Sequence, residues 1–208
     1  MIKLFEPAAD DIQILAREQC FKGFYQLDRL QLRHRQFNGQ MGPQISRELF
    51  VRHDAVCVLP YDPVLEQVVL IEQFRVGALD KGQTPWLLEL VAGLIDKDEV
   101  PEQVAHREAL EEANLALEAL LPITRYFPSP GGSDEWVHLY VGRCDSAKAG
   151  GVFGLTEEGE DIRVHVLSLD TALAALESGQ IGNAATIIAL QWLALNRQKV
   201  RKAWQLAV

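Results

Sequence analysis

A strand-like apolar run that ends at a glycine and leads into an acidic helix is the feature that most constrains the fold. The run covers residues 86–92 and ends at Gly93. Residues 101–113 then predict a helix with Pro101 in its first turn, where the missing N–H costs no hydrogen bond. Glu111 and Glu112 lie three and four residues after Glu108, so the three carboxylates share one face of this helix.

The crowding of these carboxylates has two interpretations. Like charges at this spacing destabilise an isolated helix by roughly 0.2–0.5 kcal/mol per pair. A hard divalent cation reverses that repulsion, because Mg²⁺ takes oxygen ligands and keeps several of its waters. Taken alone, the three glutamates more often belong to an ordinary solvated helix face. The flanking sequence is needed to choose between the two.

The rest of the chain predicts interleaved strands and helices. Residues 1–45 indicate a small, mostly β extension with a bend at Gly23, and residues 46–208 form the main domain. In the main domain we expect strands at 55–59, 68–71, 119–127, 135–142 and 162–166, and closing helices at 169–178 and 183–203. Ser168 and Asn183 are the candidate N-caps of those helices. The expected fold class is α+β, a mixed β-sheet between helices in an α/β/α sandwich.

Charge and composition exclude several classes of function. The formal net charge of −9 argues against a nucleic-acid surface, which needs a basic field. The longest apolar runs are far too short to span a bilayer. Cys20, Cys57 and Cys144 are odd in number and lack CxxC spacing, so we expect free thiols in a reducing compartment, by default the cytoplasm.

Residues 93–115 resemble the Nudix box, Gly-x5-Glu-x7-Arg-Glu-U-x-Glu-Glu-x-Gly-U, in which U is a bulky aliphatic residue. Gly93, Glu99, Arg107 and the three helix glutamates all match. Ala109 is smaller than the usual residue, which alters packing only mildly. Asn114 replaces the second glycine, at a helix end where a left-handed backbone is expected and Asn is the next-best residue.

The resemblance implies a Mg²⁺-dependent pyrophosphatase, with Mn²⁺ as an alternative metal. It assigns Glu108, Glu112 and the Ala92 carbonyl as metal ligands. Glu111 would be a catalytic carboxylate, and Arg107 would orient the carboxylates through charge-assisted hydrogen bonds. The metal would bind the diphosphate and acidify the attacking water.

Further runs are similar to the bacterial ADP-ribose pyrophosphatases, such as residues 69–75, 84–93, 129–132 and 160–166. That subfamily places an acidic loop over the diphosphate, and residues 157–160 fit its position. The resemblance implies Glu158 as the general base, with Glu157 and Glu160 as alternatives, and Glu160 as a further metal ligand. Positions implied to bind substrate are Phe24, Tyr25, Arg47, Glu48, Arg52, Arg75, Leu94, Ser129 and Glu135.

The same resemblance predicts a homodimer with exchanged N-terminal segments, in which residues 1–45 serve dimerisation. The leading hypothesis is hydrolysis of ADP-ribose to AMP and ribose 5-phosphate by an ADP-ribose diphosphatase, an acid anhydride hydrolase of nucleotide metabolism. One alternative is a pyrophosphatase for another nucleotide sugar such as GDP-mannose. The other is a non-catalytic module that senses ADP-ribose, which the intact box carboxylates argue against.

Overall fold

A computed structural model describes residues 2, 4–81, 84–96, 98–155 and 159–206. The chain divides into two compact units. One consists of Met1–His53 with Phe127–Glu135, and the other of Asp54–Tyr126 with Trp136–Val208. In the part of the chain that the structure describes, no helix is long and apolar enough to cross a membrane.

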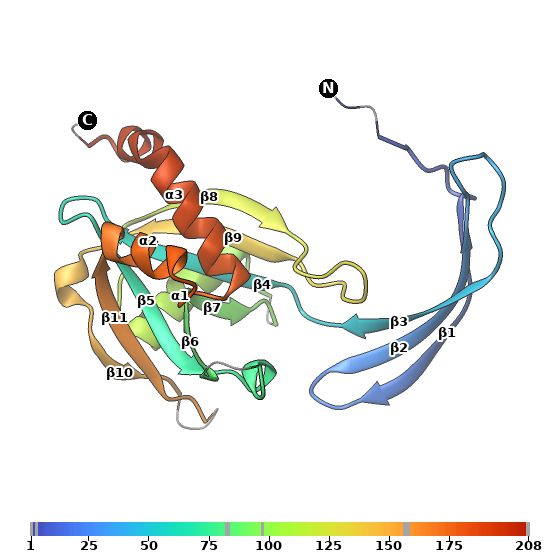
Figure 1. Ribbon diagram of the computed structural model, residues 1–208, viewed down its shortest axis with the longest axis horizontal. Coiled ribbons are helices and arrows are strands. Elements are labelled where there is room, and N and C mark those ends of the chain that lie inside the picture. Colours follow the sequence, from blue (N-terminus) through green and yellow to red (C-terminus); the bar gives the residue numbers. More distant parts are fainter. Residues whose placement is uncertain (1, 3, 82–83, 97, 156–158, 207–208) are drawn as a thin grey trace. The chain divides into compact units, whose positions relative to one another are not determined.

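The larger unit is built on a mixed sheet (Figure 1). Its strand order is β10-β11-β5-β4-β9-β8, with β6 added beside β5 and β7 beside β4. The β4–β9 pair is parallel and the other pairs are antiparallel. The strands are β4 Ala55–Asp62, β5 Gln67–Phe74, β6 Trp86–Glu89, β7 Val91–Leu94, β8 Ala119–Tyr126, β9 Val137–Arg143, β10 Gly151–Phe153 and β11 Ile162–Ser168.

Both faces of this sheet are buried, because its central strands are apolar at consecutive positions. Val68 and Leu70 of β5 pack in one core with α2 (Leu169–Glu177) and α3 (Ala184–Ala203). Val69 and Ile71 pack in a second core with α1 (Pro101–Ala113). Figure 1 shows the helices on opposite sides of the sheet. The predicted mixed sheet between helices is therefore confirmed.

The helix ends follow their local sequence signals. Asn114 ends α1 with φ 50° and ψ 37°, the left-handed conformation expected at this position. The side chain of Ser168 accepts a hydrogen bond from the backbone N–H of Thr171 at the start of α2. Asn183 caps α3 in the same way through the N–H of Thr186. The short helices η1 (Val76–Ala78) and η2 (Ser146–Lys148) complete the unit.

The sequence suggested one strand at residues 86–92, but the structure has two. The run divides at the buried Leu90 into β6, which pairs with β5, and β7, which pairs with β4. The change of partner is set by the sheet rather than by local composition. It places Ala92 and Gly93 on a strand paired with the centre of the sheet, against α1.

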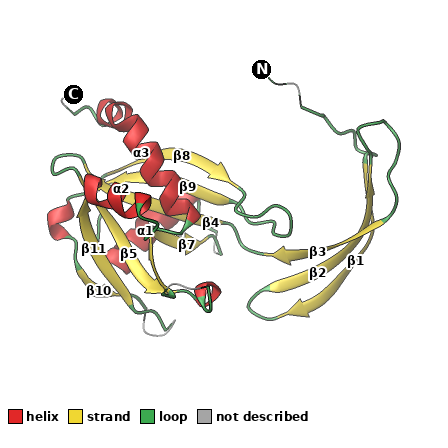
Figure 2. Cartoon of the chain, in the orientation of Figure 1, coloured by secondary structure: helices red, strands yellow, loops and turns green. Residues whose placement is uncertain are grey.

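The smaller unit contains a three-stranded antiparallel sheet in the order β1-β2-β3 (Figure 2). Its strands are β1 Ile12–Lys22, β2 Gln26–His34 and β3 Ile45–Val51. The bend expected at Gly23 is the turn between β1 and β2, where the N–H of Gly23 donates to the carbonyl of Tyr25 at 2.8 Å. Every residue of β1 is exposed, including the apolar Ile12, Ile14 and Phe21.

Candidate active site

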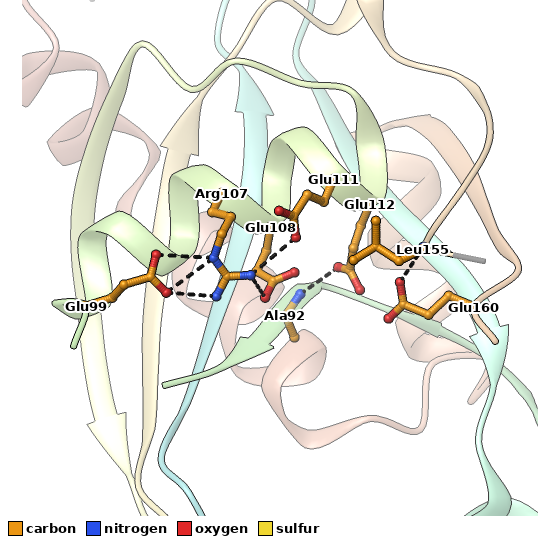
Figure 3. Close-up of polar contacts among 8 residues, drawn as sticks. All are labelled: Ala92, Glu99, Arg107, Glu108, Glu111, Glu112, Leu155 and Glu160. Atoms are coloured by element: carbon orange, nitrogen blue, oxygen red, sulfur yellow. Dashed lines mark hydrogen bonds and ion pairs between the residues drawn. The ribbon is translucent and has the colours of Figure 1, made fainter. Parts of the chain in front are cut away.

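Arg107 stands at the centre of the box carboxylates (Figure 3). Its Nη1 donates to Glu108 Oε1 at 2.7 Å and to Glu111 Oε2 at 3.2 Å. Its Nε and Nη2 donate to Glu99 at 3.1 to 3.3 Å. One guanidinium thus holds three carboxylates that would otherwise repel one another. These contacts fit the orienting role expected of Arg107, and they attach Glu99 to the same network.

Glu112 is held between α1 and β7. Its Oε2 accepts a hydrogen bond from the backbone N–H of Ala92 at 3.0 Å, and the residue is 3% exposed. Glu108 lies beside β7 too, because Gly93 has no side chain. A Cβ at Gly93 would collide with Oε1, Cδ and Cγ of Glu108. The turn from strand to helix therefore places two carboxylates against one short piece of backbone.

Burial makes negative charge costly at these two positions. It raises the pKa of Glu108 to about 7 and that of Glu112 to about 8. Arg107 opposes the rise at Glu108 more strongly than the neighbouring acids add to it. Glu112 is buried and Glu108 is partly buried, and both carboxyl groups lie against β7. Such a pair of carboxylates suits a hard divalent cation, which prefers oxygen ligands. The residues present therefore fit a Mg²⁺ or Mn²⁺ site.

Glu160 lies near this pair, and its negative charge contributes to the raised pKa of both Glu108 and Glu112. Its Oε2 accepts from the N–H of Leu155 at 3.0 Å (Figure 3), which ties Glu160 to the base of the acidic segment. Across the described residues, no three acidic, His or Cys side chains form a ready-made metal cluster. The predicted base Glu158 and its alternative Glu157 lie outside the described residues.

Two further predicted substrate residues belong to the larger unit. Arg75 follows β5, and its Nε donates to Glu89 Oε2 at 2.7 Å. Its positive charge also acts on Glu112, where it opposes the effect of burial. Leu94 is the last residue of β7 and is partly buried. No sequence pattern indicated Glu89, which enters the site through its contact with Arg75.

Four of the predicted substrate residues come together in the smaller unit. The rings of Phe24 and Tyr25 lie 4.8 Å apart, and the guanidinium of Arg52 lies 5.0 Å from the Tyr25 ring centroid. Arg52 Nη1 also pairs with the buried Glu135 at 3.2 Å. Phe50 extends this aromatic cluster, with its ring 4.8 Å from Tyr25. The sequence analysis missed it, although its place on β3 near Arg52 offered a signal.

The remaining substrate candidates of the smaller unit are less constrained. Arg47 and Glu48 are exposed on β3. Arg47 donates to the carbonyl of Ser46, and Glu48 forms an ion pair with Arg29. The carbonyl of Ser129 accepts from the N–H groups of Gly132 and Ser133, forming the turn expected there.

Curated relatives match nearly the whole chain. The chain is 49% identical over 195 residues to the ADP-ribose pyrophosphatase of Escherichia coli K12, covering 94% of this chain and 93% of the relative. It is 41% identical over 198 residues to the ADP-ribose pyrophosphatase of Haemophilus influenzae, covering 94% and 91%. The GDP-mannose pyrophosphatase of Citrobacter koseri is 36% identical over 150 residues, covering 71% and 77%.

A solved structure has the same fold. A crystal structure described as an ADP compounds hydrolase matches with a TM-score of 0.70 at 19% identity, covering 96% of this chain and 98% of that one. At that identity the likeness shows the fold. The family model for the NUDIX domain matches residues 51–190, which include the whole carboxylate cluster on α1. The chain therefore belongs to the NUDIX domain family.

Proposed function

We propose that this protein hydrolyses the diphosphate bond of ADP-ribose to AMP and ribose 5-phosphate, using Mg²⁺. The observation that carries the proposal is the extent of similarity to ADP-ribose pyrophosphatases. It covers 94% of the chain and so includes residues outside the family domain at 51–190. The match to the GDP-mannose enzyme is lower and covers 71%. The pair of carboxylates that α1 places against β7, Glu108 and Glu112, supports the chemistry.

The carboxylates of Glu108 and Glu112, with the carbonyl of Ala92, would hold the metal, and Glu160 would add a ligand. The bound metal would neutralise phosphate charge and lower the pKa of the attacking water. Arg107 keeps Glu108 and Glu111 in place through its hydrogen bonds. Arg75 offers a guanidinium, which suits a phosphate oxygen pair. Glu158 remains the proposed base.

A panel of substrates tests this proposal against its rivals. The purified protein is given ADP-ribose, GDP-mannose, NADH or a diadenosine compound with Mg²⁺, and the products are separated by chromatography. We expect the highest kcat/KM with ADP-ribose, and AMP with ribose 5-phosphate as products. A preference for GDP-mannose would support the second candidate, which the 36% identical relative keeps open. Binding of ADP-ribose without turnover would indicate a sensing module.

We also propose a homodimer in which the N-terminal segments are exchanged. The three-stranded sheet exposes Ile12, Ile14 and Phe21 on β1, and a sheet of this size needs an apolar face packed against something else. A second copy of the chain is the occupant we propose. A cytoplasmic location completes the proposal, since the three cysteines are free.

Deleting residues 1–45 is expected to abolish the dimer and weaken ADP-ribose binding together. The reason is that the deletion removes both β1 and the aromatic pair Phe24–Tyr25, which we assign to the adenine. Sedimentation gives the oligomeric state, and steady-state kinetics give KM.

Phe24→Ala separates the two effects, because one exposed ring is removed and the strands remain. It should keep the dimer and raise KM by roughly ten-fold, as for loss of one base-stacking ring. A monomeric full-length protein with an ordinary KM would contradict the exchanged dimer.

A further inference from the structure

The guanidinium of Arg75 forms an ion pair with a buried acid, Glu89. Its Nε donates to Glu89 Oε2 at 2.7 Å, and the side chains of the two residues are 44% and 6% exposed. Glu89 is the last residue of β6 and pairs with Ile71 of β5, so it lies on the strand beside the one that leads to Arg75. A partly exposed arginine is thereby attached to a rigid part of the sheet.

The other oxygen of Glu89 is held by a helix cap. Asn183 Nδ2 donates to Glu89 Oε1 at 2.7 Å, although the two residues are 94 positions apart. The opposite end of the same amide, Asn183 Oδ1, accepts from the N–H and the hydroxyl of Thr186 at 3.2 Å. Because both oxygens of Glu89 have a donor, its carboxylate has one orientation. The amide of Asn183 is likewise fixed by its cap.

This arrangement decides which part of the guanidinium can meet a ligand. With Nε engaged by Glu89, the two terminal NH₂ groups of Arg75 remain, and within the described residues neither of them donates a hydrogen bond. They form the paired-donor edge that binds two phosphate oxygens together. Glu89, which holds Arg75, lies three residues before Ala92, whose N–H donates to Glu112 at 3.0 Å, so Arg75 and the box carboxylates are attached to the same short stretch of backbone. A free arginine in this position would have to lose its rotamer freedom on binding.

We propose that Glu89 and Asn183 are positioning residues for Arg75, which fix its terminal NH₂ groups for the substrate diphosphate beside Glu108 and Glu112. The inference rests on the proposed function for the identity of that ligand. The contacts that fix Arg75 are independent of it. Asn183 then has two roles, since it caps α3 and also orients Glu89, the acid that binds Arg75.

Two substitutions remove the positioning contacts with little change in shape. In Glu89→Gln one carboxylate oxygen becomes an NH₂ group, which must face a donor, either Arg75 or Asn183. In Asn183→Asp the cap is kept, because Asp also accepts from the first turn of a helix. The donor to Glu89 is lost, however, and a second negative charge faces it. Both variants should raise KM for ADP-ribose by about ten-fold and change kcat by less than about three-fold, since a phosphate contact made throughout the reaction is lost.

The matched background is Arg75→Ala. If Glu89 acts through Arg75, Glu89→Gln should have almost no further effect on KM once Arg75 is absent. A purely structural role would instead give the same factor in both backgrounds, and that result would overturn the proposal. Thermal unfolding of each variant measures the structural part of the effect. Should Glu89→Gln fail to fold, the same cycle is run with Asn183→Asp.

A substrate-free measurement separates this inference from the proposed function. NMR of the arginine Nε–H groups should show a protected signal that Arg75→Ala removes and so assigns. We expect that signal to lose its protection in Glu89→Gln. Its persistence would refute the positioning role even in an active ADP-ribose hydrolase. Loss of protection in a protein that does not cleave ADP-ribose would leave the positioning role intact and overturn only the proposed function.

Discussion

Glu112→Gln is expected to remove most of the turnover and leave the fold intact. Gln keeps the shape of the side chain, and its amide oxygen can still accept the hydrogen bond from Ala92 that Glu112 accepts at 3.0 Å. It lacks the negative charge that a divalent cation requires. We expect kcat to fall by roughly 10³-fold, about 4 kcal/mol of barrier, if productive metal binding is lost. Steady-state kinetics over a range of Mg²⁺ concentrations measure the loss.

In the metal-free protein, the same substitution should reduce the loss of stability that occurs as pH rises. Burial raises the pKa of Glu112 to about 8, above its ordinary value of 4.5, so the folded state holds this proton more tightly than the unfolded state. Metal-free wild-type protein must therefore lose stability as pH rises from about 4.5 to about 8, and Glu112→Gln should flatten that fall. Mg²⁺ should restore the stability of the wild type at pH 8 more than that of the variant.

Glu177→Gln is the control. Glu177 is an exposed residue at the end of α2, so this substitution removes the same charge at a position away from the site. It should leave both kcat and the pH dependence of unfolding unchanged. Wild-type turnover of Glu112→Gln at saturating Mg²⁺ would exclude Glu112 as a metal ligand. An unaltered pH profile of metal-free unfolding would show that its carboxyl group titrates normally.

Local signals in the sequence were enough for the helices. Pro101 opens α1, Asn114 ends it in the left-handed conformation, and Ser168 and Asn183 cap α2 and α3. Each of these features depends on hydrogen bonds within a few residues. The spacing of the three box glutamates also fixed their common face. Arg107 could be assigned to them because it lies on the same helix.

Features that depend on distant pairing could not be predicted in this way. The break at Leu90 arises because β6 and β7 pair with different strands, and no glycine or proline within residues 86–92 marks it. Glu89 meets Arg75 and Asn183 only after the sheet and α3 have assembled. Nothing in the spacing of these three residues indicates that one acid lies between an arginine and a helix cap.

Gly93→Ala is expected to impair catalysis far more than stability. The three atoms nearest to an added Cβ all belong to the side chain of Glu108, which lies across the place where the methyl group would be. A flexible side chain can move, so the backbone of β7 can remain in the sheet. Glu108 would then leave its position and its 2.7 Å contact with Arg107. A displacement of about 1 Å in such a group can cost roughly 10²-fold in rate.

The experiment compares kcat/KM, the Mg²⁺ dependence and the thermal midpoint of Gly93→Ala with those of Gly77→Ala. Gly77 is exposed, and nothing lies within 4 Å of a Cβ built there, so the same added methyl group meets no neighbour. We expect at least a roughly 10²-fold loss of kcat/KM and a higher Mg²⁺ requirement for Gly93→Ala alone. If Gly93→Ala unfolds the protein, the glycine serves β7 rather than Glu108. If it remains fully active, the position of Glu108 beside β7 is not the one used in catalysis. Only a folded variant that binds Mg²⁺ poorly and is nearly inactive supports the conclusion that Gly93 makes room for the carboxylate of Glu108.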